Sequence, residues 1–80
     1  MRPSGVGEEQ VVDRQPVTSS NIASVGYDDA AQALEVEFLN GSIYQYFGVP
    51  SAVHSALLSA DSVGGYFSRS IKNSYQFVRL

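Results

Sequence analysis

Aromatic and basic side chains alternate along the C-terminal quarter of the sequence. The aromatic and basic members of this series are Tyr66, Arg69, Lys72, Tyr75, Phe77 and Arg79. A groove for single-stranded nucleic acid needs both kinds of group, because bases stack on aromatic rings while cations meet the phosphates. We therefore predict that this segment carries a binding surface for RNA, tRNA or another anionic ligand.

Gly64 and Gly65 stand near the start of a helix that Ser62 is expected to cap, with Arg69 and Lys72 one to two turns further on. Free backbone amides beside these cations would form an anion site, which could also hold a small nucleotide-like ligand between subunits. The alternative interpretation is that the glycines let the helix approach its neighbour closely. Because the spacing is not that of a phosphate loop, we favour packing.

Metal binding and catalysis are not predicted. His54 is the only histidine and cysteine is absent, so neither a ligand cluster nor a nucleophile with a nearby base is indicated. Glu35 and Glu37 alternate along one strand and are expected to form a solvated face. We therefore expect a non-enzymatic protein without a cofactor or metal.

The 80 residues are enough for one small domain, and the net charge of -3 argues against indiscriminate adhesion to nucleic acid. The charge is unevenly spread, because residues 61–80 carry a basic excess and residues 19–60 contain no Lys or Arg. There is no signal-peptide core and no apolar run of about 18 residues, so a cytoplasmic protein without a membrane segment is expected.

Residues 1–18 are predicted to be a flexible leader, because they are rich in Gly, Pro, Gln and charge without apolar periodicity. The domain is expected over 19–80. A first strand is predicted over 22–27, with Ala23, Val25 and Tyr27 pointing inward. A turn at 28–32 should lead into a second strand.

A β-hairpin turning at Asn40 and Gly41 is the strongest structural signal. A two-residue turn would place Tyr44 and Tyr46 on the acidic face of the second strand. A bulged loop with Gly41 in the bulge position would instead pair Tyr44 with Val36 and Tyr46 with Leu34. Burial of each tyrosine is worth about 2 kcal/mol, more than the preference among turn types, so we predict the bulged hairpin and a core role for both rings.

Two short helices follow the hairpin. Pro50 fits the first turn of one, with an apolar stripe through Val53 and Leu57, and Val63 and Phe67 mark the apolar side of the other. The tail over 75–80 is either an added edge strand or an extended arm. The predicted fold class is α+β, with an antiparallel sheet of three strands, or four with the tail, packed against the two helices.

These residues resemble the KTSC domain over about residues 19–80. The resemblance is carried by the segments 20–28, 34–38, 40–42, 44–46, 48–50, 66–67 and 71–72. That family is named for the C-terminus of some lysyl-tRNA synthetases and also occurs as short bacterial and phage proteins, and a role in RNA binding has been suggested for it. The resemblance therefore implies the same role here. Relatives usually have basic residues where this chain has Gln45 and Gly65, and both differences remove charge that RNA would attract.

The leading hypothesis is a non-enzymatic module that binds RNA or another anion on its C-terminal basic and aromatic face. A second hypothesis is a protein-interaction or self-association module that uses an exposed strand edge, in phage–host conflict for example.

Overall fold

The computed structural model describes residues 14–80. Most of the predicted leader, residues 1–13, lies outside the described residues. The elements in chain order are β1 (Arg14–Pro16), β2 (Ile22–Asp28), β3 (Ala33–Phe38), β4 (Ile43–Tyr46), α1 (Ser51–Ser59), α2 (Val63–Ser70) and β5 (Phe77–Arg79).

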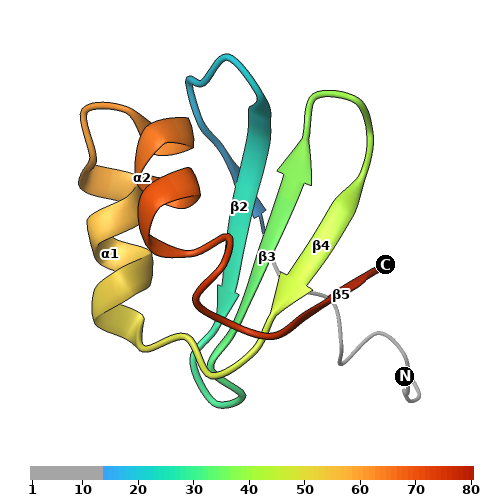
Figure 1. Ribbon diagram of the computed structural model, residues 1–80, viewed down its shortest axis with the longest axis vertical. Helices are drawn as coiled ribbons and strands as arrows, with labels where there is room; N and C mark the ends of the chain where they lie inside the picture. The colour runs from blue at the N-terminus through green and yellow to red at the C-terminus, as the bar shows by residue number, and fades with distance from the viewer. Residues whose placement is uncertain (1–13) are drawn as a thin grey trace, which may run out of the picture.

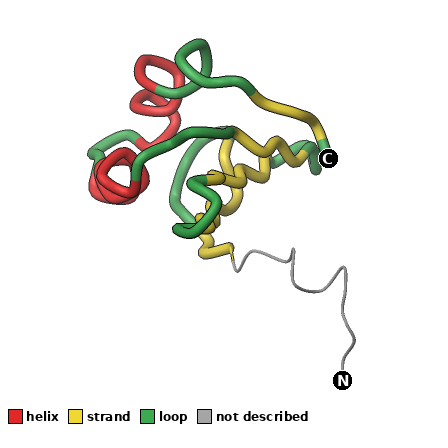
Figure 2. Tube along the Cα trace, turned by 90° about the horizontal axis from the view of Figure 1, so that it is seen from below, coloured by secondary structure: helices red, strands yellow, loops and turns green. Residues whose placement is uncertain are grey.

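The five strands form one antiparallel sheet in which spatial order follows chain order, from β1 at one edge to β5 at the other. Both helices lie between β4 and β5 in the chain and gather on one face of the sheet (Figures 1 and 2). The predicted α+β class is confirmed. The predicted strand number of three or four is too small, since β1 was not foreseen.

β1 lies within the segment that was predicted to be a leader. It pairs with β2 and places Arg14 opposite Gly26, which in turn lies opposite Glu35 of β3. Because Gly26 has no side chain, the Arg14 guanidinium can extend across β2 and form an ion pair with the Glu35 carboxylate. The ordered sheet therefore begins before residue 19, the predicted domain boundary.

The face that carries the two glutamates is not simply solvated. Glu35 is only 5% exposed, which requires the compensating charge of Arg14. Glu37 is half-buried and accepts a hydrogen bond from the Ser24 hydroxyl at 2.8 Å. The expectation of a solvated face is thus wrong for Glu35, because β1 supplies a partner that the pattern of β3 alone does not reveal.

The β3–β4 hairpin has the predicted bulged register. Val36 lies opposite Tyr44 and Leu34 opposite Tyr46. The Phe38 amide donates to the Ser42 carbonyl at 2.8 Å, and Gly41 has a φ of 93°, a left-handed conformation that glycine adopts at little cost. The choice of this register from tyrosine burial is therefore confirmed.

β2 differs from the predicted alternation at its start. Ile22 lies opposite Phe38 while Ser24 lies opposite Glu37, so Ala23 is the extra residue of a β-bulge. The bulge changes the parity of the strand, which lets both Ile22 and Val25 point into the core. The predicted inward direction is confirmed for Val25 and wrong for the Ile22 and Ala23 pair.

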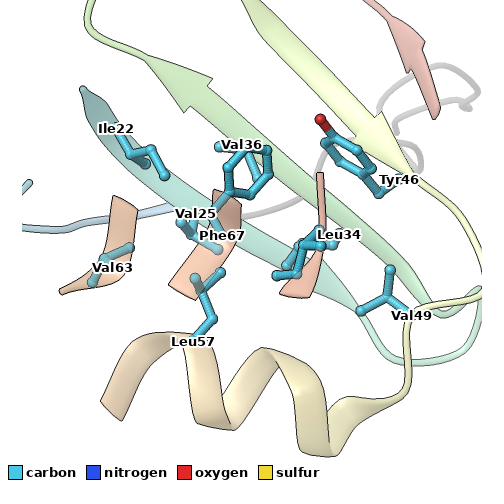
Figure 3. Close-up of a cluster of buried hydrophobic side chains, with 10 residues drawn as sticks. Ile22, Val25, Leu34, Val36, Tyr46, Val49, Leu57, Val63 and Phe67 are labelled. Atoms are coloured by element: carbon cyan, nitrogen blue, oxygen red, sulfur yellow. The ribbon is translucent and has the colours of Figure 1, made fainter. Parts of the chain in front are cut away.

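The core lies between the sheet and the helices (Figure 3). The predicted apolar sides of both helices are confirmed, since Leu57, Val63 and Phe67 are buried. Ser62 caps α2 as expected, because its hydroxyl accepts from the Gly65 amide at 3.0 Å. Pro50 is the residue immediately before α1. The tail forms β5, the edge-strand alternative.

Candidate binding site

A pocket of about 260 Å³ opens between the β3–β4 hairpin and α2. Its aromatic lining comes from three elements: Phe38, Tyr44, Tyr46 and Phe67. Its polar lining surrounds these rings: Asn21, Asn40, Ser42, Ser68 and Lys72. The volume lies just below the range of about 300–1,000 Å³ that is typical of small-molecule sites, so it suits one planar group rather than a large ligand.

The aromatic lining is held rigidly by ring-on-ring contacts. Phe38 meets the rings of Tyr44 and Phe67 edge-on, at centroid distances of 5.6 and 5.5 Å. Phe67 also meets Tyr46 edge-on at 5.5 Å. These distances and angles are those that aromatic pairs favour, so the lining is preorganised before any ligand arrives.

The two tyrosines of β4 differ in exposure although they share a face. Tyr46 is 3% exposed and belongs to the core, whereas Tyr44 is half-buried and packs at its margin. The predicted core role is therefore confirmed for Tyr46. Tyr44 has a mixed position, with part of its ring available to a ligand in the pocket.

The Tyr46 hydroxyl is a buried polar group without a protein partner within residues 14–80, where no hydrogen bond to it is formed. Figure 3 shows this hydroxyl directed away from Val49 and Leu57. Burial, together with the nearby Tyr44, raises the pKa of Tyr46 above 10.0, so its hydroxyl stays protonated at neutral pH. It is therefore available as a hydrogen-bond donor beside the pocket.

One of the predicted cations lines this pocket, and a second lies beside it. Lys72 contributes to its rim and follows the C-terminal end of α2. Arg79 of β5 lies opposite Tyr44, and its Nη2 donates to the hydroxyl of Ser42, which also lines the pocket, at 3.2 Å. The site thus combines aromatic rings with cations from two separate segments.

Phe77 extends the aromatic lining toward the edge of the sheet. Its ring lies 5.5 Å from that of Tyr44 and 5.2 Å from that of Tyr46, centroid to centroid. It is still 49% exposed. Phe77 therefore extends the rings of the pocket as far as the exposed edge strand β5.

The structure separates the other predicted site residues from this pocket. Tyr66 and Tyr75 are half-buried and pack against the core. Arg69 is exposed on α2, with its Nη1 close to Gly65. The continuous surface expected from the sequence order is therefore divided, because α2 turns Tyr66 and Arg69 away from the pocket and Tyr75 packs against the core from the segment between α2 and β5.

The two glycines of α2 lie in close packing. A β-carbon on Gly64 would lie 2.5 Å from Asn21 Oδ1, and the Gly65 amide already donates to Ser62. The space over the first turn is thus filled by Ser19 and Asn21 on one side and by Arg69 on the other. This arrangement matches the packing interpretation of the glycine pair.

The pocket residues that the sequence did not single out are mostly polar: Asn21, Ser42, Ser68 and Phe38. Phe38 could have been predicted as a pocket residue. It alternates with Leu34 and Val36 on one strand face, and the bulged register places that face next to Tyr44. The polar residues could not have been predicted, since they come from three segments that only the packing of α2 on the hairpin brings together.

His54 lies away from this pocket and stacks on Tyr27, with ring centroids 4.7 Å apart and planes inclined by 11°. Burial lowers the pKa of His54 below its ordinary value of 6.5. The unfolded chain therefore takes up the proton first as the pH falls. The contribution of His54 to stability is complete above pH 6.5 and is lost as the pH falls through the lowered pKa.

Replacement of His54 by phenylalanine should keep the stack on Tyr27 and remove the proton uptake. Thermal denaturation at about pH 7.5 and about pH 5.5, either side of the ordinary histidine pKa, should show a smaller decrease in Tm for His54→Phe than for the unaltered protein. An equal decrease in both proteins would mean that His54 does not carry this pH dependence.

Among residues 14–80, no group of three or more potential metal ligands is close enough to hold an ion. No helix in the same range is long and apolar enough to cross a membrane.

The domain matches the KTSC domain family over residues 18–75. This chain belongs to the KTSC domain family. The crystal structure of a KTSC domain protein from Yersinia pestis superposes with a TM-score of 0.82 at 41% identity, over 88% of this chain and 99% of that one. The family assignment, like the fold, is thus supported over nearly the whole described domain.

Curated relatives of this KTSC domain are of two kinds. An uncharacterised protein from Stutzerimonas stutzeri is 44% identical over 84% of this chain and 96% of its own length. A lysine–tRNA ligase from Nostoc punctiforme is 39% identical over 76% of this chain, but the match covers only 11% of the ligase. The domain therefore occurs both as a short protein and as a small part of a large enzyme.

Proposed function

We propose that this KTSC domain is a non-enzymatic module that binds an unpaired RNA nucleotide in the aromatic pocket. The observation that carries the proposal is the buried Tyr46 hydroxyl, which has no partner among the described residues and lies beside a cavity lined by aromatic rings and a lysine. Water in the pocket can accept from this hydroxyl in the free protein, and a ligand acceptor would take the place of that water.

The chemistry of the pocket suits a nucleotide. A base can stack on the accessible part of Tyr44, and its polar edge can reach the Tyr46 hydroxyl and the nearby amide and hydroxyl groups. Lys72 and Arg79 flank the rings and can meet the phosphates on either side. The overall charge of -3 limits binding elsewhere on the domain, so affinity should depend on this one site.

The occurrence of related sequence in lysine–tRNA ligases supports an RNA ligand, because those enzymes are named for acting on tRNA. We propose that the domain acts in the cytoplasm, together with the RNA that it binds. The same argument does not extend their catalytic activity to this chain, since the match covers only 11% of the ligase.

Titration of the protein with fluorescently labelled single-stranded RNA at about 50 mM and about 200 mM salt tests the proposal, since phosphate contacts weaken steeply over this range. We expect saturable binding that is tighter at the lower salt concentration. No binding at the lower concentration would contradict the proposal.

The salt dependence gives a sharper prediction for Lys72. Each phosphate contact to a single strand contributes about 0.7 to the slope of log affinity against log salt concentration. Lys72→Ala should therefore weaken binding and reduce this slope by about 0.7. Arg69→Ala removes the same charge from α2 outside the pocket and is the matched control; an equal reduction in both variants would place the phosphate contact elsewhere.

A further inference from the structure

The outer edge of β5 is open within residues 14–80, where β5 is the last strand of the sheet. Hydrogen bonds to β4 fix which way its backbone groups point. The Phe47 amide donates to the Gln76 carbonyl and the Leu80 amide to the Ile43 carbonyl, both within 2.9 Å. Since these groups alternate along an antiparallel ladder, residues 76, 78 and 80 face β4, and the amides and carbonyls of Phe77 and Arg79 face outward.

The same edge displays apolar side chains. Phe77, Val78 and Leu80 are 49%, 46% and 61% exposed, and they are three of the five large apolar residues exposed in the described part of the chain. The opposite edge of the sheet is different, because β1 contains Pro16, which has no amide to donate, and the charged Arg14. Only the β5 edge has both unpaired backbone groups and an apolar surface, without a residue that blocks pairing.

From this edge we infer that β5 pairs antiparallel with β5 of a second copy of the chain and joins the two sheets. The inference does not rest on the RNA proposal, although Arg79 takes part in both. With the two-fold axis at Val78, Phe77 of each copy lies opposite Arg79 of the other. The amides and carbonyls of Phe77 and Arg79 then pair with those of the second copy in four hydrogen bonds. If the two-fold axis lay instead at Phe77 or at Arg79, some of these groups would be left unpaired.

The side chains are also compatible with this register. Arg79 would face the exposed ring of Phe77 across the axis rather than another arginine, and a cation over an aromatic ring is favourable. On the other face, the two Val78 side chains would meet at the axis with Leu80 beside them. A second copy therefore covers each exposed apolar residue of the strand. The strand is short, so we expect a dimer that forms at high protein concentration.

Cysteine cross-linking tests the register, because the chain contains no cysteine of its own. Residues at the axis form a non-hydrogen-bonded pair with α-carbons about 4.5 Å apart, which is within disulfide range. Under oxidising conditions Val78→Cys should yield a covalent dimer. Arg79→Cys, whose partner would be Phe77, and Ser59→Cys on the exposed side of α1 should remain largely monomeric.

Sedimentation equilibrium of the unaltered protein should show twice the chain mass as its concentration is raised. Val78→Lys places two positive charges at the axis and should abolish this dimer without loss of the folded circular dichroism spectrum. Three outcomes would overturn the inference: a monomer at every concentration, no cross-link through Val78→Cys, or equal cross-linking through Ser59→Cys. In the first two cases the outer edge of β5 would instead be available for pairing with a strand of another protein.

Discussion

Tyr44→Ala is expected to weaken binding of single-stranded RNA by about 5-fold to about 150-fold, since a stacked base contributes about 1–3 kcal/mol. Tyr44 is the ring of the pocket that combines partial exposure with edge-on support from Phe38, so a base can lie against it without unfolding the core. Fluorescence anisotropy with a labelled oligonucleotide measures the change directly.

Tyr75→Ala is the matched control for this experiment. Tyr75 is also half-buried and packs against the core, but it does not line the pocket. Its removal should lower stability while leaving the RNA affinity of the folded protein within about 2-fold, less than 0.5 kcal/mol. Equal losses of affinity in the two variants would show that Tyr44 acts through stability and not through stacking.

Arg14→Ala is expected to lower the free energy of unfolding by about 2 kcal/mol, because it leaves the carboxylate of Glu35 buried without a partner. Removal of one partner from a fully buried ion pair costs roughly 3–5 kcal/mol. The expected cost is smaller here, because the Arg14 side chain is 29% exposed and water can partly replace it. Chemical denaturation at neutral pH provides the measurement. Arg69→Ala, which removes an exposed arginine of α2, should change stability by less than about 0.5 kcal/mol.

A second variant separates the ion pair from the loss of the arginine stem. Glu35→Gln removes the buried charge, so in that background Arg14→Ala should cost less than it does alone. If Arg14→Ala costs the same with and without the glutamate, the charge pair does not stabilise the junction of β1 with the sheet.

The hairpin is the part of the fold that the sequence predicts best, and the reason is local. Asn40 and Gly41 restrict the turn, while the alternation of Leu34, Val36 and Phe38 fixes which face must be buried. Register then depends on neighbouring residues alone. The pairing of Tyr44 with Val36 therefore follows from tyrosine burial without any knowledge of the rest of the chain.

β1 could not be predicted in this way, because Arg14, Gln15 and Pro16 show no apolar alternation and are all exposed. Its position depends on pairing with β2 and on an ion pair to a residue 21 positions away. The bulge at Ala23 is equally non-local, since it reflects the need to bury both Ile22 and Val25 against the helices.

The candidate site was predicted only in part for the same reason. Lys72, Arg79 and Phe77 were identified from composition, and they do lie at or beside the pocket. Their sequence neighbours Arg69 and Tyr66 do not, because a helix distributes successive side chains around its axis. The pocket arises where α2 packs on the hairpin, so its polar lining is a tertiary feature.

Mapping RNA contacts by NMR tests the central claim most directly. In a titration of the isotope-labelled protein with single-stranded RNA, we predict that backbone amide shifts change at Tyr44, Tyr46, Ser68 and Lys72, around the aromatic pocket. Shifts that change instead around Arg69 and the two glycines of α2, with none at the pocket, would contradict the proposal.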